Sequence, residues 1–136
     1  MKVAVMGYGT VGSGVVEVIE THKKSISNRT GGEILEVSKI LDLRDFPGDE
    51  HELLFTKDFN DILNDDEIKV VAETMGGVNP AFDFTMKLIE SGKSVVTSNK
   101  ELVAQTGLEL LQAAEKHGVN YLFEASVGGG IPIIRP

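Results

Sequence analysis

Short hydrophobic runs alternate along this chain with longer stretches in which apolar and polar positions follow a helical period. Residues 2 to 6 (Lys-Val-Ala-Val-Met) form a compact apolar run that predicts a buried strand. Four later runs rich in aliphatic residues predict further strands. They cover residues 34 to 43, 69 to 73, 94 to 97 and 120 to 125.

The stretches between these runs predict helices. After the first strand, four residues at i, i+4, i+7 and i+11 predict one buried helix face: Val11, Val15, Val18 and His22. A short helix is expected around residues 58 to 64. Asn79-Pro80 predicts the start of another, because Asn caps free N–H groups and Pro has no N–H to satisfy.

That helix should bury Phe82, Met86 and Ile89 and end at Gly92. Residues 106 to 109 (Thr-Gly-Leu-Glu) predict a capping box for a last helix closed by Gly118. Strands and helices thus alternate throughout. Right-handed crossovers then favour a three-layer α/β domain with a doubly wound, mainly parallel sheet over residues 1 to 136.

Composition and charge narrow the function. The 136 residues are 41% hydrophobic, which suits one core, and the chain has no cysteine for disulfides or thiolate chemistry. Residues 42 to 67 hold ten acidic residues against two basic ones, within a net charge of -8. This acidic belt disfavours nucleic-acid binding, and no apolar run is long enough for a membrane span. We expect a cytoplasmic protein.

A glycine-rich turn follows the first strand directly. Residues 7 to 12 read Gly-Tyr-Gly-Thr-Val-Gly, the Gly-x-Gly-x-x-Gly pattern of dinucleotide-binding domains. Gly7 would make the tight turn, Gly9 would let a pyrophosphate approach, and Gly12 would let helix and strand pack closely. The sequence therefore predicts a Rossmann-type domain that binds NAD or NADP.

The same stretch disfavours two other kinds of phosphate-binding loop. A kinase glycine loop needs a valine where this chain has Gly14, and a phosphate-binding P-loop needs a lysine where it has Ser13.

The end of the second predicted strand should distinguish NAD from NADP, and it offers two candidates of opposite charge. A carboxylate at Asp42 would bind the ribose diol, whereas the guanidinium of Arg44 would bind a 2′-phosphate. Both also lie at the edge of the acidic belt, where they could simply be solvated. The cofactor preference is left open by the sequence.

Three later polar turns follow strands, where ligands of open α/β sheets bind. They are Thr74-Met75-Gly76-Gly77, residues 97 to 101 (Thr-Ser-Asn-Lys-Glu) and residues 124 to 132 (Glu-Ala-Ser-Val-Gly-Gly-Gly-Ile-Pro). Together with the first turn, they resemble the amino-terminal half of homoserine dehydrogenase. The resemblance extends over residues 7 to 16, 76 to 77, 95 to 102 and 123 to 134.

That family interconverts L-homoserine and L-aspartate 4-semialdehyde with NADPH or NADH, a step in threonine and methionine biosynthesis. The resemblance implies that Thr10 and Val11 contact the pyrophosphate, and that Thr74 and Gly76 lie against the cofactor. Asn99 and Lys100 would border nicotinamide and substrate. Lys100 is the candidate catalytic residue, since a lysine beside a carbonyl stabilises developing negative charge.

The resemblance also implies a monovalent cation, usually sodium. Its ligands would be Glu124 and the carbonyl oxygens of Val127, Gly129 and Ile131, since hard cations prefer oxygen.

The family's substrate-binding acids and general-acid lysine lie in a following domain, which this sequence does not contain. We therefore expect a piece of a longer, homo-oligomeric enzyme that binds cofactor weakly and turns over no substrate alone. The alternatives are a domain of another amino-acid dehydrogenase, or a non-catalytic NAD(P) sensor, because a fold does not dictate chemistry.

Overall fold

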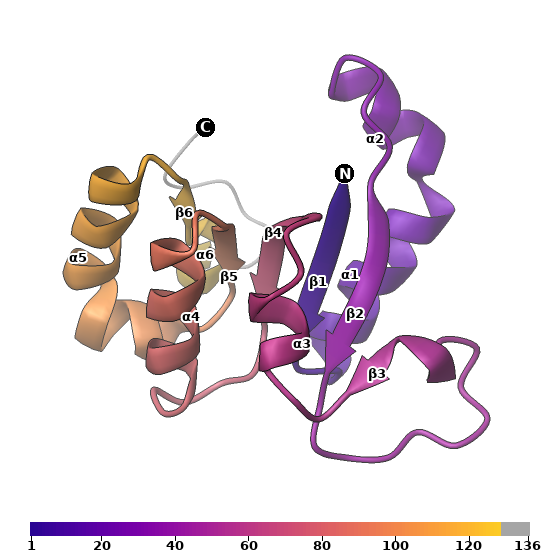
Figure 1. Ribbon diagram of the computed structural model, residues 1–136, viewed down its shortest axis with the longest axis horizontal. Helices are drawn as coiled ribbons and strands as arrows, with labels where there is room; N and C mark the ends of the chain where they lie inside the picture. Colours follow the sequence, from indigo (N-terminus) through magenta and orange to yellow (C-terminus); the bar gives the residue numbers. More distant parts are fainter. Residues whose placement is uncertain (129–136) are drawn as a thin grey trace.

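The computed structural model describes residues 1–128 and contains one six-stranded parallel sheet in that part of the chain (Figure 1). The strand order is β3-β2-β1-β4-β5-β6. The chain therefore adds β2 and β3 on one side of β1 and then returns to add β4, β5 and β6 on the other side of β1. The elements in chain order are β1 Lys2–Met6, α1 Thr10–Thr21, α2 Lys23–Arg29, β2 Glu36–Leu41, the 3-10 helix η1 Glu52–Leu54, β3 Phe55–Thr56, α3 Asn60–Leu63, β4 Ile68–Glu73, α4 Ala81–Glu90, β5 Ser94–Thr97, α5 Lys100–His117, β6 Tyr121–Leu122 and α6 Glu124–Gly128.

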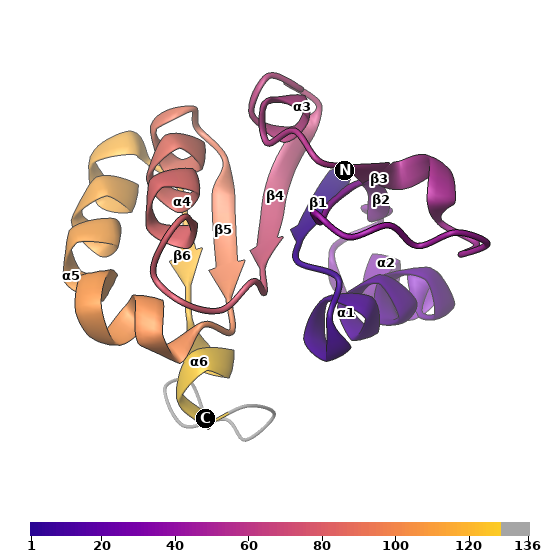
Figure 2. The same ribbon diagram turned by 90° about the horizontal axis from the view of Figure 1, so that it is seen from below.

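Helices cover both faces of this sheet. Alternation along β1 sends Val3 and Val5 into a cluster with Val16 of α1, while Ala4 and Met6 join the cluster under α4 and α5. Figure 2 shows α1 and α2 on one side of the strands and α4 and α5 on the other. The predicted doubly wound, three-layer α/β fold is confirmed.

The buried face of α1 differs from the prediction. Its buried residues are Gly12, Val16 and Ile19, whereas Val11 and Val18 are 51% and 53% exposed. Aliphatic residues lie on two faces of the helix, so two faces fitted the helical spacing of apolar residues. The close approach of the helix to β1 at Gly12 selects the second face.

The starts of α4 and α5 also differ from the predictions. Helix α4 begins at Ala81 after Pro80, and no side chain caps it, so the proposed Asn79 cap is wrong. Helix α5 begins at Lys100, capped by Asn99, and the Thr106 hydroxyl bonds within the helix instead of starting it. The run from 100 to 105 is rich in good helix formers, which extends the helix toward the sheet.

The interior of α4 and the end of α5 fit the predictions better. Ile89 is buried in α4 as predicted, together with Ala81, Thr85 and Leu88, while Phe82 and Met86 are only half-buried. Gly118 closes α5 in the left-handed conformation at φ 67°, as expected.

The last predicted strand is shorter than expected. Only Tyr121–Leu122 pair with β5, and α6 begins at Glu124.

A buried lysine lies at the amino ends of β4 and β5. Lys93 is 4% exposed, and its Nζ donates to the backbone oxygens of Asp65 (2.7 Å) and Ile68 (3.1 Å). Within residues 1–128, no helix combines the length and apolar character needed to cross a bilayer.

Candidate functional site

A cavity of about 470 Å³ opens at the carboxyl ends of β1, β2 and β4. This is where the strand order reverses direction, the place at which open α/β sheets bind ligands. Five of the predicted site residues line the cavity: Gly7, Gly9, Asp42, Arg44 and Thr74. Its other lining residues are Leu41, Leu43, Lys57, Met75, Pro80 and Phe84.

The glycine turn joins β1 to α1 along one wall of this cavity. Gly7 has a φ of +91°, and a Cβ at Gly12 would lie only 1.8 Å from the Gly7 carbonyl oxygen. Gly9 is different, because a Cβ there would meet no atom within 4 Å. Gly7 and Gly12 are thus required by the fold itself, whereas Gly9 keeps the open approach to the amino end of α1.

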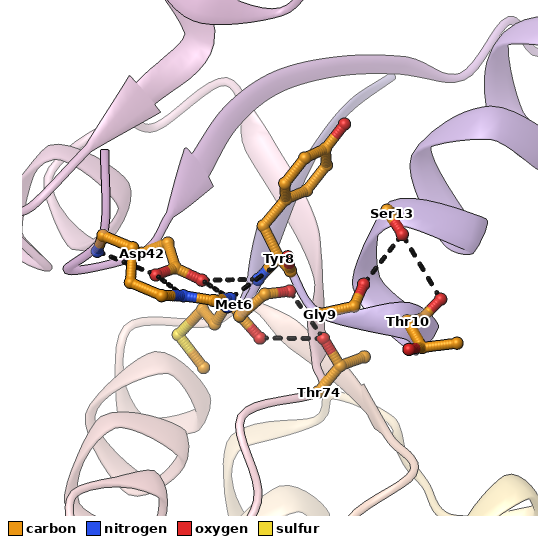
Figure 3. Close-up of polar contacts among 9 residues, drawn as sticks. Met6, Tyr8, Gly9, Thr10, Ser13, Asp42 and Thr74 are labelled. Atoms are coloured by element: carbon orange, nitrogen blue, oxygen red, sulfur yellow. Dashed lines mark hydrogen bonds and ion pairs between the residues drawn. The ribbon is translucent and has the colours of Figure 1, made fainter. Parts of the chain in front are cut away.

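Thr74, at the end of β4, braces this turn from the neighbouring strand. Its hydroxyl lies 3.0 Å from the Met6 carbonyl oxygen and 2.8 Å from that of Gly7, and its N–H donates to Met6 (Figure 3). The single hydroxyl proton is therefore committed to the turn. Thr74 lines the cavity, and its hydroxyl supports the turn.

Asp42, just after β2, holds the turn from the other side. Its side chain is 8% exposed and accepts hydrogen bonds from the Tyr8 N–H at 2.8 Å and from Arg44 Nη2 at 2.8 Å (Figure 3). The guanidinium of Arg44, followed by backbone N–H donors, holds the pKa of Asp42 well below its usual range against the opposing effect of burial.

Arg44 is shared between this carboxylate and its surroundings. Nη2 also donates to the Tyr8 carbonyl oxygen at 3.2 Å, and Cζ lies 5.1 Å from the centre of the Phe46 ring. The side chain nevertheless stays 61% exposed at the cavity. The two candidates of opposite charge are therefore one ion pair, with the carboxylate inside and the cation outside.

An aromatic cluster that the sequence did not reveal supports this end of the cavity. Tyr8 packs edge-on against Phe46 and Phe55, whose own rings stack at 4.7 Å. A second cavity, of about 440 Å³, lies beside it between Arg44 and Lys57. Three aromatic residues spaced over nearly fifty positions carry no periodic signal, so only the fold brings them together.

His51 ties the loop before β3 to helix α1. Nε2 lies 2.8 Å from a carboxylate oxygen of Glu20 and Nδ1 lies 3.0 Å from Asp49, while the Tyr8 hydroxyl is 3.3 Å from Nδ1. The bond to Glu20, assisted by Asp49, raises the pKa of His51 against the effect of burial. Sequence reasoning had assigned His51 no role.

The predicted nicotinamide-side residues lie on the turns after β4 and β5. Gly76 and Gly77 both have positive φ, and the Asn99 side chain bridges the turns by donating to the Gly77 carbonyl oxygen at 2.6 Å. Lys100 is the exposed first residue of α5. Asn99 and Gly77 are therefore in contact, while Lys100 follows them without lining the main cavity.

Beneath these turns lie Glu73, which the sequence analysis did not single out, and Thr97, which it included only as the first residue of the polar turn at residues 97 to 101. Glu73 is fully buried at the end of β4, and Thr97, at the end of β5, donates to its carboxylate at 2.5 Å. For Glu73, the signal available in the sequence was an acidic residue at the end of an apolar run that predicts a buried strand.

The predicted cation ligands are only partly within the described residues. Glu124 begins α6, and the side chain of Val127 is 55% exposed. Gly129 and Ile131 lie outside the described residues. Residues 1–128 contain no group of three or more His, Asp or Glu side chains placed to hold a metal, so the carbonyl-based cation site stays a prediction.

Comparison with known proteins gives a consistent result. The family model for the NAD binding domain of homoserine dehydrogenase matches residues 7–124. The homoserine dehydrogenases of Lactococcus lactis and Pseudomonas aeruginosa are 41% and 42% identical to this chain over 99% of its length. The chain covers 32% and 31% of those two proteins, about a third of their length.

Solved structures agree with the sequence matches. The crystal structure of a homoserine dehydrogenase from Thiobacillus denitrificans superposes on 98% of this chain with a TM-score of 0.88 at 40% identity, and the chain covers 31% of it. A homoserine dehydrogenase from S. aureus gives a TM-score of 0.85 at 37% identity over 96% of this chain and 33% of its own. This chain therefore belongs to the homoserine dehydrogenase family and forms its NAD(P)-binding domain.

Proposed function

We propose that the cavity beside the glycine turn binds NADP(H) in preference to NAD(H). We also propose that the protein carrying this domain interconverts L-homoserine and L-aspartate 4-semialdehyde. The observation that carries the binding proposal is the cavity itself, which combines the open face of Gly9 with two cations, Arg44 and Lys57.

The residues present fit a dinucleotide. The first N–H groups of a helix have no partners inside it, and those of α1 lie at Gly9, Thr10 and Val11, where a pyrophosphate would accept from them. The missing Cβ at Gly9 leaves the space a phosphate needs. Thr10 and Val11 would accordingly contribute mainly their backbone.

The cations favour a 2′-phosphate. Asp42 is already saturated by Tyr8 and Arg44, so it is poorly placed to accept from a ribose diol. Arg44 is exposed at the cavity, and Lys57, 56% exposed, pairs within residues 1–128 with the surface carboxylate of Asp45 at 2.7 Å. Both cations can turn toward a phosphate at modest cost.

At the other end, the bound cofactor supplies the hydride for the aldehyde–alcohol interconversion. Gly76 and Gly77 would leave room for its nicotinamide half, and Asn99 would keep their turn against α5. The ammonium of Lys100 would stabilise negative charge developing on a carbonyl oxygen. A monovalent cation near Glu124, homo-oligomer formation and a cytoplasmic location remain further predictions.

Parallel titration of NADPH and NADH tests the cofactor proposal. Arg44→Ala should weaken NADPH binding by about tenfold to a hundredfold, the value of charge-assisted hydrogen bonds, and leave NADH binding no weaker. Arg29→Ala, at an exposed arginine of α2, is the matched control and should change neither. Equal losses for both cofactors in Arg44→Ala, or no loss for either, would contradict a 2′-phosphate site.

A further inference from the structure

A fully buried carboxylate lies where β4 and β5 end, beneath the two turns assigned to the nicotinamide side. Glu73 has no exposed surface. One of its oxygens accepts from the Met75 N–H at 2.8 Å, and the other accepts from the Thr97 hydroxyl at 2.5 Å. Glu73 thus bonds to the turn that follows its own strand and to the end of the neighbouring strand.

The chain of bonds continues through Thr97 to the start of α5. The Thr97 hydroxyl oxygen accepts from the Asn99 N–H at 2.9 Å. The Asn99 side chain then works in two directions, accepting from the Leu102 N–H at 3.1 Å and donating to the Gly77 carbonyl oxygen at 2.6 Å. The bonds form a closed loop, because Gly77 lies four residues after Glu73.

Stability alone is a poor reason for this arrangement. Within residues 1–128, Glu73 forms no salt bridge, and its side-chain partners are one hydroxyl and one backbone N–H. Burying a carboxylate on neutral donors is costly compared with an apolar side chain. What the loop does accomplish is geometric, since it fixes the turn at Gly76 and Gly77 against the first residue of α5.

We propose that Glu73, Thr97 and Asn99 are positioning residues that hold these two turns at the separation required by the nicotinamide half of the cofactor. This inference rests on the proposed binding of NADP(H). It adds that the turns on the nicotinamide side of the cofactor have a separate set of supporting residues. The other half of the cofactor would be bound elsewhere, with its pyrophosphate at the glycine turn that Asp42 and Thr74 brace and its 2′-phosphate at Arg44 and Lys57. Damage to the positioning residues should therefore affect one half of the ligand and spare the other.

Two ligands distinguish binding of the nicotinamide half of the cofactor from binding of the adenosine half. NADPH contains both, whereas 2′,5′-ADP contains the adenosine and its 2′-phosphate without nicotinamide. In Thr97→Val and Glu73→Gln we expect NADPH to bind about tenfold more weakly, the effect of losing a buried hydrogen bond, and 2′,5′-ADP to bind within about twofold of the unaltered chain. The fluorescence of bound NADPH, which reports on its nicotinamide ring, should fall toward that of free NADPH.

Two further variants separate positioning from general damage. Thr97→Ser keeps the hydroxyl and should restore NADPH binding. Thr85→Val removes a buried hydroxyl of α4 that has no hydrogen-bond partner within the described residues, and it should leave both ligands unaffected. Binding of 2′,5′-ADP also verifies in each variant that the glycine turn is folded.

The remaining outcomes have distinct meanings. If both ligands weaken together in Thr97→Val and Glu73→Gln, or if NADPH binding is unchanged in both, the positioning role is overturned. If the unaltered chain binds neither ligand, the proposed function itself is wrong.

Discussion

The sharpest prediction concerns two glycines of α1 that lie two residues apart. In Gly12→Ala the new Cβ would lie 1.8 Å from the Gly7 carbonyl oxygen and 2.8 Å from the Thr74 hydroxyl. Ordinary contact begins at 3.4 Å, so the start of α1 must retreat by about 1.6 Å, the difference between 3.4 and 1.8 Å. In Gly14→Ala the Cβ meets no atom within 4 Å.

The two substitutions should therefore change the unfolding free energy in opposite directions. Overpacking costs about 1–3 kcal/mol, and the Gly12 clash belongs at the upper end because a backbone carbonyl cannot rotate away. The helix propensity of alanine returns about 1 kcal/mol, so Gly12→Ala should lose about 2 kcal/mol of unfolding free energy. Gly14→Ala keeps only the favourable term and should gain about 0.5–1 kcal/mol.

Urea unfolding followed by far-UV circular dichroism at pH 7 measures both changes, provided that the m-values agree with that of the unaltered chain. NADPH binding should also weaken in Gly12→Ala, because the retreat moves the first N–H groups of α1 from the cavity. The reasoning is refuted if Gly12→Ala stays within about 0.5 kcal/mol of the unaltered chain, the range of ordinary surface substitutions. It is also refuted if Gly14→Ala loses as much as Gly12→Ala.

Three further predictions concern charged groups. Lys93→Met should cost about 1–3 kcal/mol in urea unfolding, because one buried backbone oxygen, of Ile68, and one part-buried oxygen, of Asp65, lose their donor. The pKa of Asp42 is lowered in the folded state, so its stabilising bond to Arg44 is present above pH about 3.9 and is lost as pH falls further. In Asp42→Asn, the unfolding free energy should therefore depend less on pH below about 3.9. The pKa of His51 is raised, so its contribution is full below pH about 6.5 and is lost as pH rises through the folded-state value. The unfolding free energy should thus fall as pH rises above about 6.5, less so in His51→Gln, and an NMR titration of His51 giving a pKa at or below 6.5 would contradict its bond to Glu20.

The fold was predictable because its determinants are local. The apolar run at residues 2 to 6 and the strand at residues 94 to 97 coincide with β1 and β5, and Gly118 ends α5 as expected. The errors arose where local signals competed. Aliphatic residues lie on two faces of α1 at helical spacing, and the tertiary approach at Gly12 decides which of the two faces is buried.

The site was predictable by position more than by role. Gly9, Arg44 and Thr74 do line one cavity, because strand ends of a parallel sheet meet at one edge. Their bonds could not be read from the sequence, since Thr74 lies 67 residues from the Gly7 carbonyl that it contacts. Glu73 illustrates the same limit, because its partner Thr97 belongs to another strand.

These bonds change what the cavity can offer an anionic ligand. The hydroxyl of Thr74 and the carboxylate of Asp42 are used in holding the glycine turn, so neither is available as a principal ligand contact. Among the groups that line the cavity, the cations of Arg44 and Lys57 remain exposed, and the open space at Gly9 leaves the start of α1 accessible. Backbone donors bind any pyrophosphate alike, so in the proposed complex discrimination between dinucleotides would come from those two cations. Because both lie near the surface, salt should screen their attraction, and the proposed preference for NADPH over NADH should shrink as ionic strength rises.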